Sequence, residues 1–459
     1  MKDWAGKHLV IVGAARQGLA LAKYLSSKGV KITVTDQKDN EKMQELIQEY
    51  QDENLNWVLG GHPLELLDTA DILSLSGGIP LTIPFVHEAL KRQIQLTNDS
   101  QVFMDTVACP VIGITGSAGK TTTTMLVGKI AQDAYGTDHT WVGGNIGNPL
   151  IAVVDQIRSE DIVVVELSSF QLDQMTTAPQ IACVLNVTPN HLDRHGTMEE
   201  YARAKARILK YQNSADTAVL NREEPGSWNL RNQVQGQLIS FGLEKPESGE
   251  IGTYLNDEMI AYWDGKSSKK LFSRNEIQLM GEHNLMNVLA ASAIAVAANF
   301  PQSSIITGIK ELTGVDHRLE LIRTYKGADW YNDSIATAPE RSIAAIKTFQ
   351  APLVLLAGGR DKDLPWSEFA RQVLKRVRYL VLFGEAAELI EKSILKESGD
   401  KLPFQIKKCA SLNEAVLQTA EIVQEGDVVL LSPGGTSFDE FVDFAERGDR
   451  FRTWVQELN

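Results

Sequence analysis

Gly113-Ile-Thr-Gly-Ser-Ala-Gly-Lys-Thr121 is the stretch of this chain that decides its fold. The apolar run from Val111 to Ile114 predicts a buried strand, and the run from Thr122 to Ala134 predicts a helix. The glycines between them let successive backbone N–H groups point toward one spot, where the helix N-terminus adds a positive dipole. Lys120 can then reach the phosphates of a nucleotide, and Thr121 can offer its hydroxyl to Mg²⁺. The stretch therefore predicts ATP or GTP binding rather than an ordinary glycine-rich turn.

The overall composition argues against several classes of protein. A length of 459 residues predicts two to four domains, and 45 Lys and Arg against 59 Asp and Glu give a net charge of −14. This acidic balance argues against a broad surface for nucleic acid or an anionic membrane. Cys109, Cys183 and Cys409 lie far apart with no CxxC spacing, which indicates a reducing compartment without a disulfide or zinc framework. No run approaches 18 apolar residues and the first residues lack the apolar core of a secretion signal, so we expect a soluble, cytoplasmic protein.

Residues 1–105 form a first predicted domain, which opens as a βαβ unit. Leu9–Val12 and Lys31–Thr35 have the composition of strands, with an amphipathic helix between them. Gly13–Gly18 follows the first strand and Asp36 ends the second, as in dinucleotide-binding folds. Because alanines replace the middle of the GxGxxG fingerprint, the pattern is weak evidence for NAD and better evidence for a nucleotide-like ligand that meets Asp36. A purely structural turn remains an alternative.

The rest of the chain divides into two further predicted domains, residues 106–313 and 314–459. Both alternate short apolar runs with helical patterns, which predicts an α/β architecture with mostly parallel sheets covered on both faces. The apolar runs are Ile162–Val165 and Ile181–Leu185 in the second domain and Leu353–Leu356, Leu380–Phe383 and Val428–Leu431 in the third.

Polar residues follow the apolar runs of the second domain. Glu166 ends one strand, and His191 lies in the loop after the next. Ligands of open α/β sheets bind at the carboxyl ends of the strands, so both residues should lie near Lys120 and Thr121. Each alone is also consistent with an ordinary surface residue, but three strand ends of one sheet contribute polar groups. This convergence favours a metal or phosphate site.

Lys205 occupies an unusual position for a charged residue. Thr197-Met-Glu-Glu200 predicts a capping box that opens a helix. One face of that helix contains Met198, Tyr201, Lys205 and Ile208. A lysine on an apolar face is rarely tolerated without a partner. Either the side chain extends past the apolar face to water, or it is held at the active site.

Glycine-rich and polar turns end the apolar runs of the third domain. Each is a generic loop by itself, but loops at successive strand ends are where a third domain would present its site. They are Trp330–Ser334, Gly358–Lys362 and Ser432–Phe438.

The ordered series of motifs resembles the Mur ligase family over nearly the whole chain. The motifs are Gly116-Ser-Ala-Gly-Lys-Thr121, Gly143-Gly-Asn-Ile-Gly147, Glu166–Gln171, Asn186–Arg194, Gly281–Asn284, His317-Arg318, Asn332-Asp-Ser334, Gly358–Lys362 and Leu431-Ser-Pro433. The resemblance implies three α/β domains. These are a Rossmann-like domain for a UDP-sugar, a P-loop ATPase domain with a mostly parallel sheet, and a Rossmann-like C-terminal domain that receives an amino acid.

Within the family, Glu166–Leu172 and Ser437-Phe438-Asp439 with Phe444 resemble the members that add D-glutamate to UDP-N-acetylmuramoyl-L-alanine. This resemblance implies that ATP phosphorylates the carboxylate of the UDP-sugar substrate. The amine of D-glutamate then attacks the acyl phosphate, and the products are an amide, ADP and phosphate, in cytoplasmic peptidoglycan precursor synthesis. We expect a monomer whose partners are these small molecules, with no nucleic-acid or membrane partner.

The resemblance also implies a role for individual residues. ATP would be bound by Gly116, Ser117, Ala118, Gly119, Lys120, Thr121, Thr122, Asn287, Arg318 and Asp333. The UDP-sugar would contact Asp36 and Asn145, and D-glutamate would contact Thr337, Lys362, Ser437 and Phe444. Of two Mg²⁺ ions, Thr121 and Glu166 would hold the first, and His191 with a carbamylated Lys205 the second. Lys120, His191 and Lys205 are the expected catalytic residues.

The chain departs from the family's pattern at a few positions. It has Ser117-Ala118 where many members have Thr-Asn, and Ser76-Gly-Gly78 where many have Ser-Pro-Gly. Ile335 and Ala338 stand where many members have Lys and Asn. A cation that those members carry near the reacting phosphate or the incoming amino acid is therefore absent at position 335.

Three alternatives to this interpretation remain. A sister ligase of the same fold would add L-alanine, a diamino acid, a dipeptide, or glutamate to folate, although the DNPR-like motif of diamino-acid ligases does not appear in the third domain. A regulatory P-loop protein would not need Glu166, His191 and Lys205 together. An NAD-dependent oxidoreductase is supported only by Gly13–Gly18 and Asp36.

Overall fold

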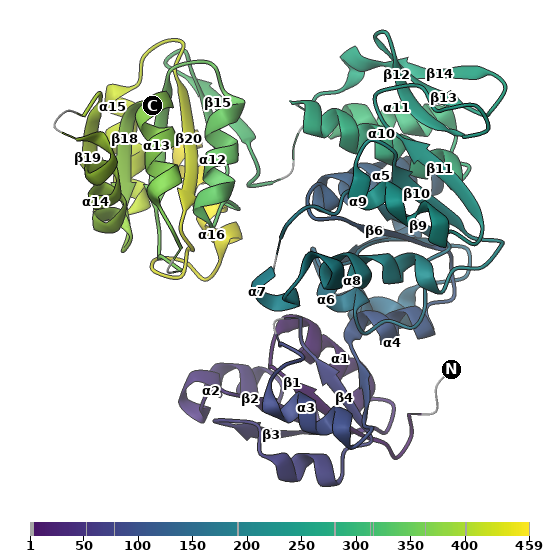
Figure 1. Cartoon of the computed structure of the whole chain (residues 1–459). Helices are drawn as coiled ribbons and strands as arrows, with labels where there is room; N and C mark the ends of the chain where they lie inside the picture. Colours follow the sequence, from purple (N-terminus) through teal and green to yellow (C-terminus); the bar gives the residue numbers. More distant parts are fainter. Residues whose placement is uncertain are drawn as a thin grey trace. The chain divides into compact units, whose positions relative to one another are not determined.

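The computed structural model describes residues 4–51, 53–77, 79–190, 192–279, 281–312, 314, 316–362, 364–399 and 402–458, with the backbone alone described at 42, 192 and 193. The chain forms two compact units, Met1–Leu312 and Thr313–Asn459. Figure 1 labels many of their helices and strands. In the described part of the chain, no helix is long and apolar enough to span a bilayer.

The first unit begins with a five-stranded sheet in the order β3-β2-β1-β4-β5, whose strand pairs are all parallel. Its strands are β1 (His8–Val12), β2 (Lys31–Asp36), β3 (Leu55–Leu59), β4 (Ile72–Leu75) and β5 (Gln95–Thr97). The connecting helices are α1 (Arg16–Ser26), α2 (Asn40–Glu49), η1 (Leu64–Asp68), α3 (Pro84–Lys91) and α4 (Asp99–Thr106). Strand β1 is buried along its whole length, as expected for the centre of a doubly covered parallel sheet.

A second sheet in the same unit has nine strands in the order β14-β13-β12-β11-β10-β9-β6-β8-β7. The strands are β6 (Val111–Thr115), β7 (Thr140–Gly144), β8 (Ile162–Glu166), β9 (Ile181–Val184), β10 (Thr217–Asn221), β11 (Gln237–Phe241), β12 (Gly252–Asn256), β13 (Met259–Trp263) and β14 (Ser268–Ser273). The helices are α5 (Lys120–Tyr135), η2 (Thr137–His139), η3 (Leu150–Gln156), α6 (Ser169–Leu172), α7 (Leu192–His195), α8 (Met198–Lys210), α9 (Pro225–Trp228), η4 (Asn229–Gln233), η5 (Arg274–Glu276), α10 (Glu282–Ala297) and α11 (Gln302–Glu311). Strands β6 to β12 pair in parallel, and β12, β13 and β14 pair antiparallel.

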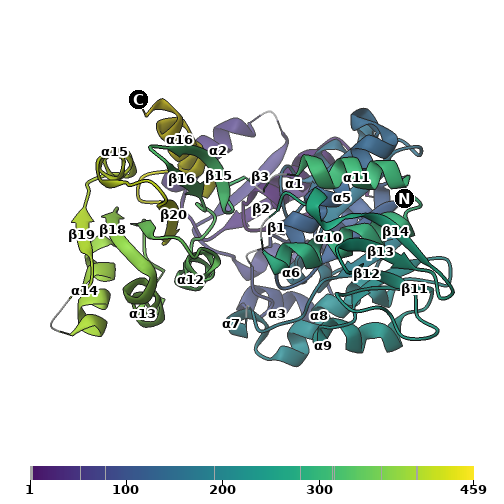
Figure 2. The same cartoon turned by 90° about the horizontal axis from the view of Figure 1, so that it is seen from above.

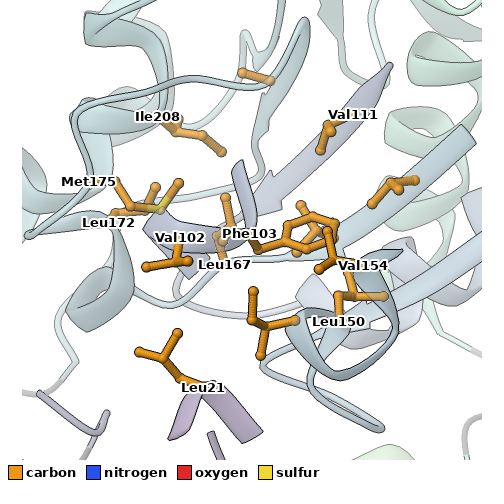
Figure 3. Close-up of a cluster of buried hydrophobic side chains, with 14 of the residues drawn as sticks. Leu21, Val102, Phe103, Val111, Leu150, Val154, Leu167, Leu172, Met175 and Ile208 are labelled. Atoms are coloured by element: carbon orange, nitrogen blue, oxygen red, sulfur yellow. The ribbon is translucent and has the colours of Figure 1, made fainter. Parts of the chain in front are cut away.

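One hydrophobic core joins the two sheets of the first unit. It includes Leu9 and Ile11 of β1 as well as Val163 and Val165 of β8. Figure 3 shows part of this core, where α1, α4 and η3 meet the segment after β8. The labelled side chains are Leu21, Val102, Phe103, Val111, Leu150, Val154, Leu167, Leu172, Met175 and Ile208. The shared core explains why the first two predicted domains form one compact unit.

The second unit is a six-stranded sheet in the order β15-β16-β20-β17-β18-β19, parallel except for β15. Its strands are β15 (Glu320–Tyr325), β16 (Ala328–Asn332), β17 (Leu353–Gly358), β18 (Val377–Phe383), β19 (Gln405–Lys408) and β20 (Val428–Gly434). Its helices are α12 (Pro339–Thr348), α13 (Ser367–Arg376), α14 (Ala387–Ser398), α15 (Leu412–Ile422) and α16 (Phe444–Glu457).

Helices cover both faces of this sheet. Figure 2 shows α12, α13 and α14 on one face and α15 and α16 on the other. Successive residues of β17 alternate between the two cores: Leu353 and Leu355 pack under α12 to α14, and Val354 and Leu356 pack under α15 and α16. This alternation is the period of two expected of a strand, with both faces apolar.

The predicted fold class is confirmed, and the predicted strands and helices are present to within a few residues at their ends. The antiparallel strands β12 to β14 were not predicted. One detail was wrong: Thr197 does cap α8 by accepting from the Glu200 N–H, but the Glu200 side chain pairs with Arg203 instead of completing a capping box. The exact boundaries of the three domains stay predictions.

Candidate active site

The predicted phosphate loop lies between β6 and α5, at the carboxyl end of the nine-stranded sheet. Gly119 is the N-cap of α5 and has a φ of 82°, in the left-handed region that favours glycine. A Cβ at this position would lie 2.3 Å from Oδ1 of Asn287. The tight turn therefore lets the backbone pass under α10 while the first N–H groups of α5 stay available to an anion.

Two lysines converge on one carbonyl of this loop. The Nζ atoms of Lys120 and Lys205 each donate to the Gly116 carbonyl oxygen at 2.9 Å, and Lys120 also donates to Ser117 at 3.4 Å. Lys205 is 1% exposed and its amine lies 4.7 Å from the ring centroid of Tyr201. Burial, reinforced by the charge of Lys120 and opposed by Glu166, lowers the pKa of Lys205 to about 6. An unmodified Lys205 is therefore a largely neutral amine at pH 7.

Thr121 and Glu166 form the predicted pair across two strand ends. The Thr121 hydroxyl donates to Glu166 Oε2 at 2.8 Å, and Asn145 Nδ2 donates to Oε1 at 3.0 Å. Glu166 is a buried carboxylate at the end of β8, and the Asn145 backbone N–H donates to its carbonyl at 3.0 Å. A hydroxyl and a carboxylate are ligands that Mg²⁺ prefers, so the oxygen donors at this position fit that ion. Asn145, predicted from the resemblance to contact the UDP-sugar, lies beside this pair.

The loop after β9 is pinned to the phosphate loop. Asn186 exchanges hydrogen bonds with Ala118, through Oδ1 to its N–H at 2.8 Å and Nδ2 to its carbonyl at 3.1 Å. The Ser117 hydroxyl donates to the Thr188 carbonyl and accepts from its N–H and from the Tyr201 hydroxyl. These roles of Asn186 and Tyr201 were not predicted from the sequence.

His191 lies outside the described residues, so its predicted place at a metal stays a prediction. Four residues later, His195 Nε2 lies 3.0 Å from the Ser169 hydroxyl, and its ring stacks on Phe170 with centroids 5.0 Å apart. These contacts hold the end of α7 against the segment that follows Glu166.

Asn287 lies beneath the first turn of α5. Its Oδ1 accepts from the Thr123 hydroxyl at 3.4 Å, and its Nδ2 donates to Asn284 Oδ1 at 3.0 Å. The side chain is buried, on the first turns of α10. The structure thus brings this predicted nucleotide-binding residue to the phosphate loop from more than 160 residues away in the sequence.

In the first sheet, Asp36 holds two turns together. Its Oδ2 accepts from the Ala14 N–H at 2.8 Å, and its Oδ1 accepts from the Lys38 N–H at 2.9 Å. Gln17, in the first turn of α1, donates to the Gly144 carbonyl at 3.5 Å. The glycine-rich turn of the first sheet therefore lies next to the end of β7, one residue before Asn145.

In the second unit, Asp333 follows β16 and is buried. Its Oδ2 accepts from the Ser432 hydroxyl at 2.8 Å and its Oδ1 from the Leu319 N–H at 3.3 Å. Burial raises the pKa of Asp333 to about 7, against the lowering effect of the Ser432 hydrogen bond and the Arg318 charge. The preceding Asn332 donates to Glu320 and to the Gly448 carbonyl.

The four residues predicted to bind D-glutamate follow three neighbouring strands of this unit. Thr337 lies after β16, Lys362 after β17, and Ser437 and Phe444 after β20. A buried arginine, Arg447, ties the loops after β16 and β20 together, a role that was not predicted from the sequence. Its guanidinium donates to the hydroxyl and carbonyl of Ser334 and to the Gly435 carbonyl.

The fold and the site define a class of nucleotide-binding α/β enzymes with a phosphate loop in the middle domain and Rossmann-like domains before and after it. Three family models match this chain in order: "Mur ligase MurD-like, N-terminal domain" over residues 7–98, "Mur ligase middle domain" over 114–295, and "Mur ligase, glutamate ligase domain" over 317–435. The chain belongs to the Mur ligase family, as its motifs predicted.

Curated relatives match over the full length. A UDP-N-acetylmuramoylalanine–D-glutamate ligase of Symbiobacterium thermophilum is 39% identical, covering 98% of each chain. One of Acetivibrio thermocellus is 37% identical, covering 100% of this chain and 98% of the relative. Among solved structures, UDP-N-acetylmuramate-alanine ligase of Thermotoga maritima matches with a TM-score of 0.58 at 17% identity, covering 98% of this chain and 99% of that one. This last likeness shows the fold alone.

Proposed function

We propose that this chain is the ATP-dependent ligase that joins the amine of D-glutamate to the terminal carboxyl of UDP-N-acetylmuramoyl-L-alanine, in peptidoglycan precursor synthesis. The observation that carries the proposal is the full-length identity to ligases named for this reaction. The convergence of Lys120, Thr121, Glu166 and Lys205 at one sheet edge supports it.

The chemistry explains why the site contains these groups. A carboxylate is a poor electrophile, and transfer of a phosphoryl group from ATP to its oxygen creates a leaving group. The amine of D-glutamate then attacks the acyl carbon, and the C–O bond to phosphate breaks while the amine loses a proton. In this scheme the α5 N-terminus and Lys120 hold the phosphates in place and offset their charge.

Mg²⁺ is implied by the family, and when bound it neutralises the charge that crowds around the transferred phosphoryl group. We propose that Thr121 and Glu166 hold one ion, and that His191 and Lys205 hold a second. Lys205 can serve as a ligand after carbamylation, in which the neutral amine attacks CO₂, forms an N–C bond and loses a proton to leave an anionic carbamate. The pKa of about 6 supports this step, because it leaves the amine unprotonated near neutral pH.

The remaining predicted contacts stay part of the proposal. Asn287, Arg318 and Asp333 would hold the nucleotide, and the buried position of Asn287 under Gly119 supports its share of this role. Asp36 and Asn145 would contact the UDP-sugar. Thr337, Lys362, Ser437 and Phe444 would contact D-glutamate. A monomeric state and a cytoplasmic location stay predictions.

Phosphate release by the purified protein tests the proposal directly. We expect release from ATP and Mg²⁺ only when UDP-N-acetylmuramoyl-L-alanine and D-glutamate are both present, and not with L-glutamate, L-alanine or a diamino acid. Release with another amino acid would keep the ligase chemistry and assign it to a sister enzyme. ATP hydrolysis that is indifferent to both co-substrates would overturn the proposal in favour of a regulatory P-loop protein.

A further inference from the structure

The loop that follows β16 contains no cation of its own. Its sequence is Asp333-Ser-Ile-Ala-Thr-Ala338, with an apolar side chain at Ile335. Yet the loop lies at the carboxyl end of the sheet, beside the loops of Lys362 and Ser437, where an amino-acid substrate with two carboxylates is proposed to bind. A second cation beside Lys362 would give such a dicarboxylate a further charge-assisted hydrogen bond, which is stronger than a neutral one.

Arg341 places a positive charge beside this loop. It lies in the first turn of α12, three residues after the end of the loop, and its Nη1 donates to the Ile335 carbonyl at 3.3 Å. The guanidinium is thus placed beside the residue that lacks a charge. A guanidinium has five N–H donors, so one hydrogen bond to the backbone leaves most of them for a ligand.

Arg341 also lies close enough to Lys362 to affect its protonation. Partial burial, with the positive charges of Arg341 and Arg447, lowers the pKa of Lys362. Of these two arginines, Arg447 is buried and occupied by Ser334 and Gly435, so it holds the loops rather than a ligand. Arg341 is exposed. Among the described residues, no carboxylate lies within ion-pair distance of Arg341 or Lys362, although the charge of Arg341 also acts on the buried Asp333 carboxyl, which the Ser432 hydroxyl and the Leu319 N–H already contact.

Two neighbouring cations repel each other, and an anion bound between them removes that cost. We propose that Arg341 is a substrate-binding residue that, together with Lys362, holds a carboxylate of D-glutamate. The inference goes beyond the proposed function by assigning a residue to the amino-acid site, and it depends on that function. Phosphate has the same oxyanion chemistry and is the competing occupant.

The first test is Arg341→Ala in the full-length protein. Loss of a charge-assisted contact to substrate should raise KM for D-glutamate about ten- to a hundredfold. KM for ATP and for the UDP-sugar should stay within about twofold. Lys347→Ala, in the last turn of the same helix, is the matched control and should leave all three constants unchanged. The circular dichroism spectrum and thermal midpoint of each variant check that it folds.

A relocated charge provides the second test. Because the Arg341 guanidinium lies at the Ile335 carbonyl, the double variant Ile335→Lys/Arg341→Ala places an amine in the same loop. We expect it to recover much of the affinity for D-glutamate that Arg341→Ala loses. A purely structural role of Arg341 in α12 would not be rescued by a charge at residue 335.

The outcomes separate the inference from the function on which it depends. If the wild-type protein shows no phosphate release that needs D-glutamate, the proposed function itself fails. If the wild-type protein does show it and Arg341→Ala keeps its KM for D-glutamate, only the role of Arg341 is wrong. A rise confined to KM for ATP would overturn the carboxylate assignment and place Arg341 at a phosphate.

Discussion

At the scale of single residues, Lys205 links the sequence pattern to the chemistry most directly. A lysine on the apolar face of a helix could have extended to solvent, but it is buried and donates to the phosphate loop. Burial of an amine costs free energy unless the amine is neutral or paired. Keeping the Lys205 amine neutral near pH 7 costs the free energy of removing its proton, and the proposed catalytic role would account for that cost.

Lys205→Ala should lower kcat on the order of a hundredfold, the scale of losing a charge-stabilising group of the transition state. Added formate or acetate should restore part of the activity, because a free carboxylate can occupy the place of the carbamate. Lys210→Ala, in the same helix but exposed, serves as control. Full activity of Lys205→Ala without added acid would remove Lys205 from the proposed metal site.

Gly119→Ala tests the tight turn of the phosphate loop. A left-handed φ costs a side chain about 1–2 kcal/mol, and the Cβ would also collide with Asn287 Oδ1 at 2.3 Å. We expect a lower thermal midpoint and a KM for ATP raised at least about tenfold. Gly136→Ala at the other end of α5 separates the two effects, because Gly136 has a φ of 92° but nothing within 4 Å of its Cβ. That variant should lose stability without any change in KM for ATP.

At the scale of elements, the N-terminus of α4 is joined to the segment after β8. Asn98 caps α4 by accepting from the Gln101 N–H, and its Nδ2 donates to the Gln171 carbonyl at 2.9 Å. Gln171 Nε2 in turn donates to Ser100 at 2.8 Å, and Gln171 Oε1 accepts from Ser168. This buried network fixes the backbone between Glu166 and α6, which contains Ser169.

Asn98→Ala should therefore cost more than an ordinary cap. Loss of an N-cap costs about 1 kcal/mol, and the unpaired Gln171 carbonyl should add about 1 kcal/mol. Ser411→Ala removes the cap of α15, which has only the bond from the Glu414 N–H, and should cost about 1 kcal/mol. Urea unfolding of both variants measures the difference. Equal losses would show that the bond to Gln171 contributes nothing.

At the scale of the whole molecule, buried titratable groups give the two units opposite pH responses. Burial lowers the pKa of His8 in the first unit, whose ring nitrogens lie 2.9 Å from the Thr33 hydroxyl and 3.0 Å from the Thr69 carbonyl. Below pH 6.5 the unfolded chain takes up a proton on His8 before the folded chain does. The contribution of His8 to stability therefore decreases as the pH is lowered. Asp333 in the second unit has a folded pKa of about 7 against an ordinary 3.8, so its folded form holds the extra proton and stability falls as pH rises from about 4 to 7.

Variants should isolate these two contributions. When the pH is lowered from 7.5 to 5, the thermal midpoint of the wild-type protein relative to that of His8→Gln should decrease. Over the same range, the midpoint relative to Asp333→Asn should increase. Scanning calorimetry without nucleotide at both pH values measures the differences. The same sign of change for both variants would contradict the assignment.

Much of the fold could be predicted because its signals are local. The apolar runs, the glycine-rich turns and Lys120-Thr121 are set by residues adjacent in sequence, and each was found where it was predicted. Strands β12 to β14 were missed because they are short and partly exposed, as the pattern of β14 shows, so they lack a continuous apolar run. The family was predicted from the order of the motifs, and the full-length relatives confirm it.

The sequence by itself determined the α/β class, the phosphate loop and the candidate residues at the strand ends, because spacing along one chain fixes which groups a single turn presents. Only the tertiary structure decided which distant groups meet. The amine of Lys205 reaches the carbonyl of Gly116 across 89 residues, and Arg447 reaches Ser334 across 113. Such contacts depend on which strands are neighbours and on how the helices pack, and no local pattern encodes them. The same holds for Arg341 and Lys362, which come from separate strand ends and are near enough for the Arg341 charge to lower the pKa of Lys362.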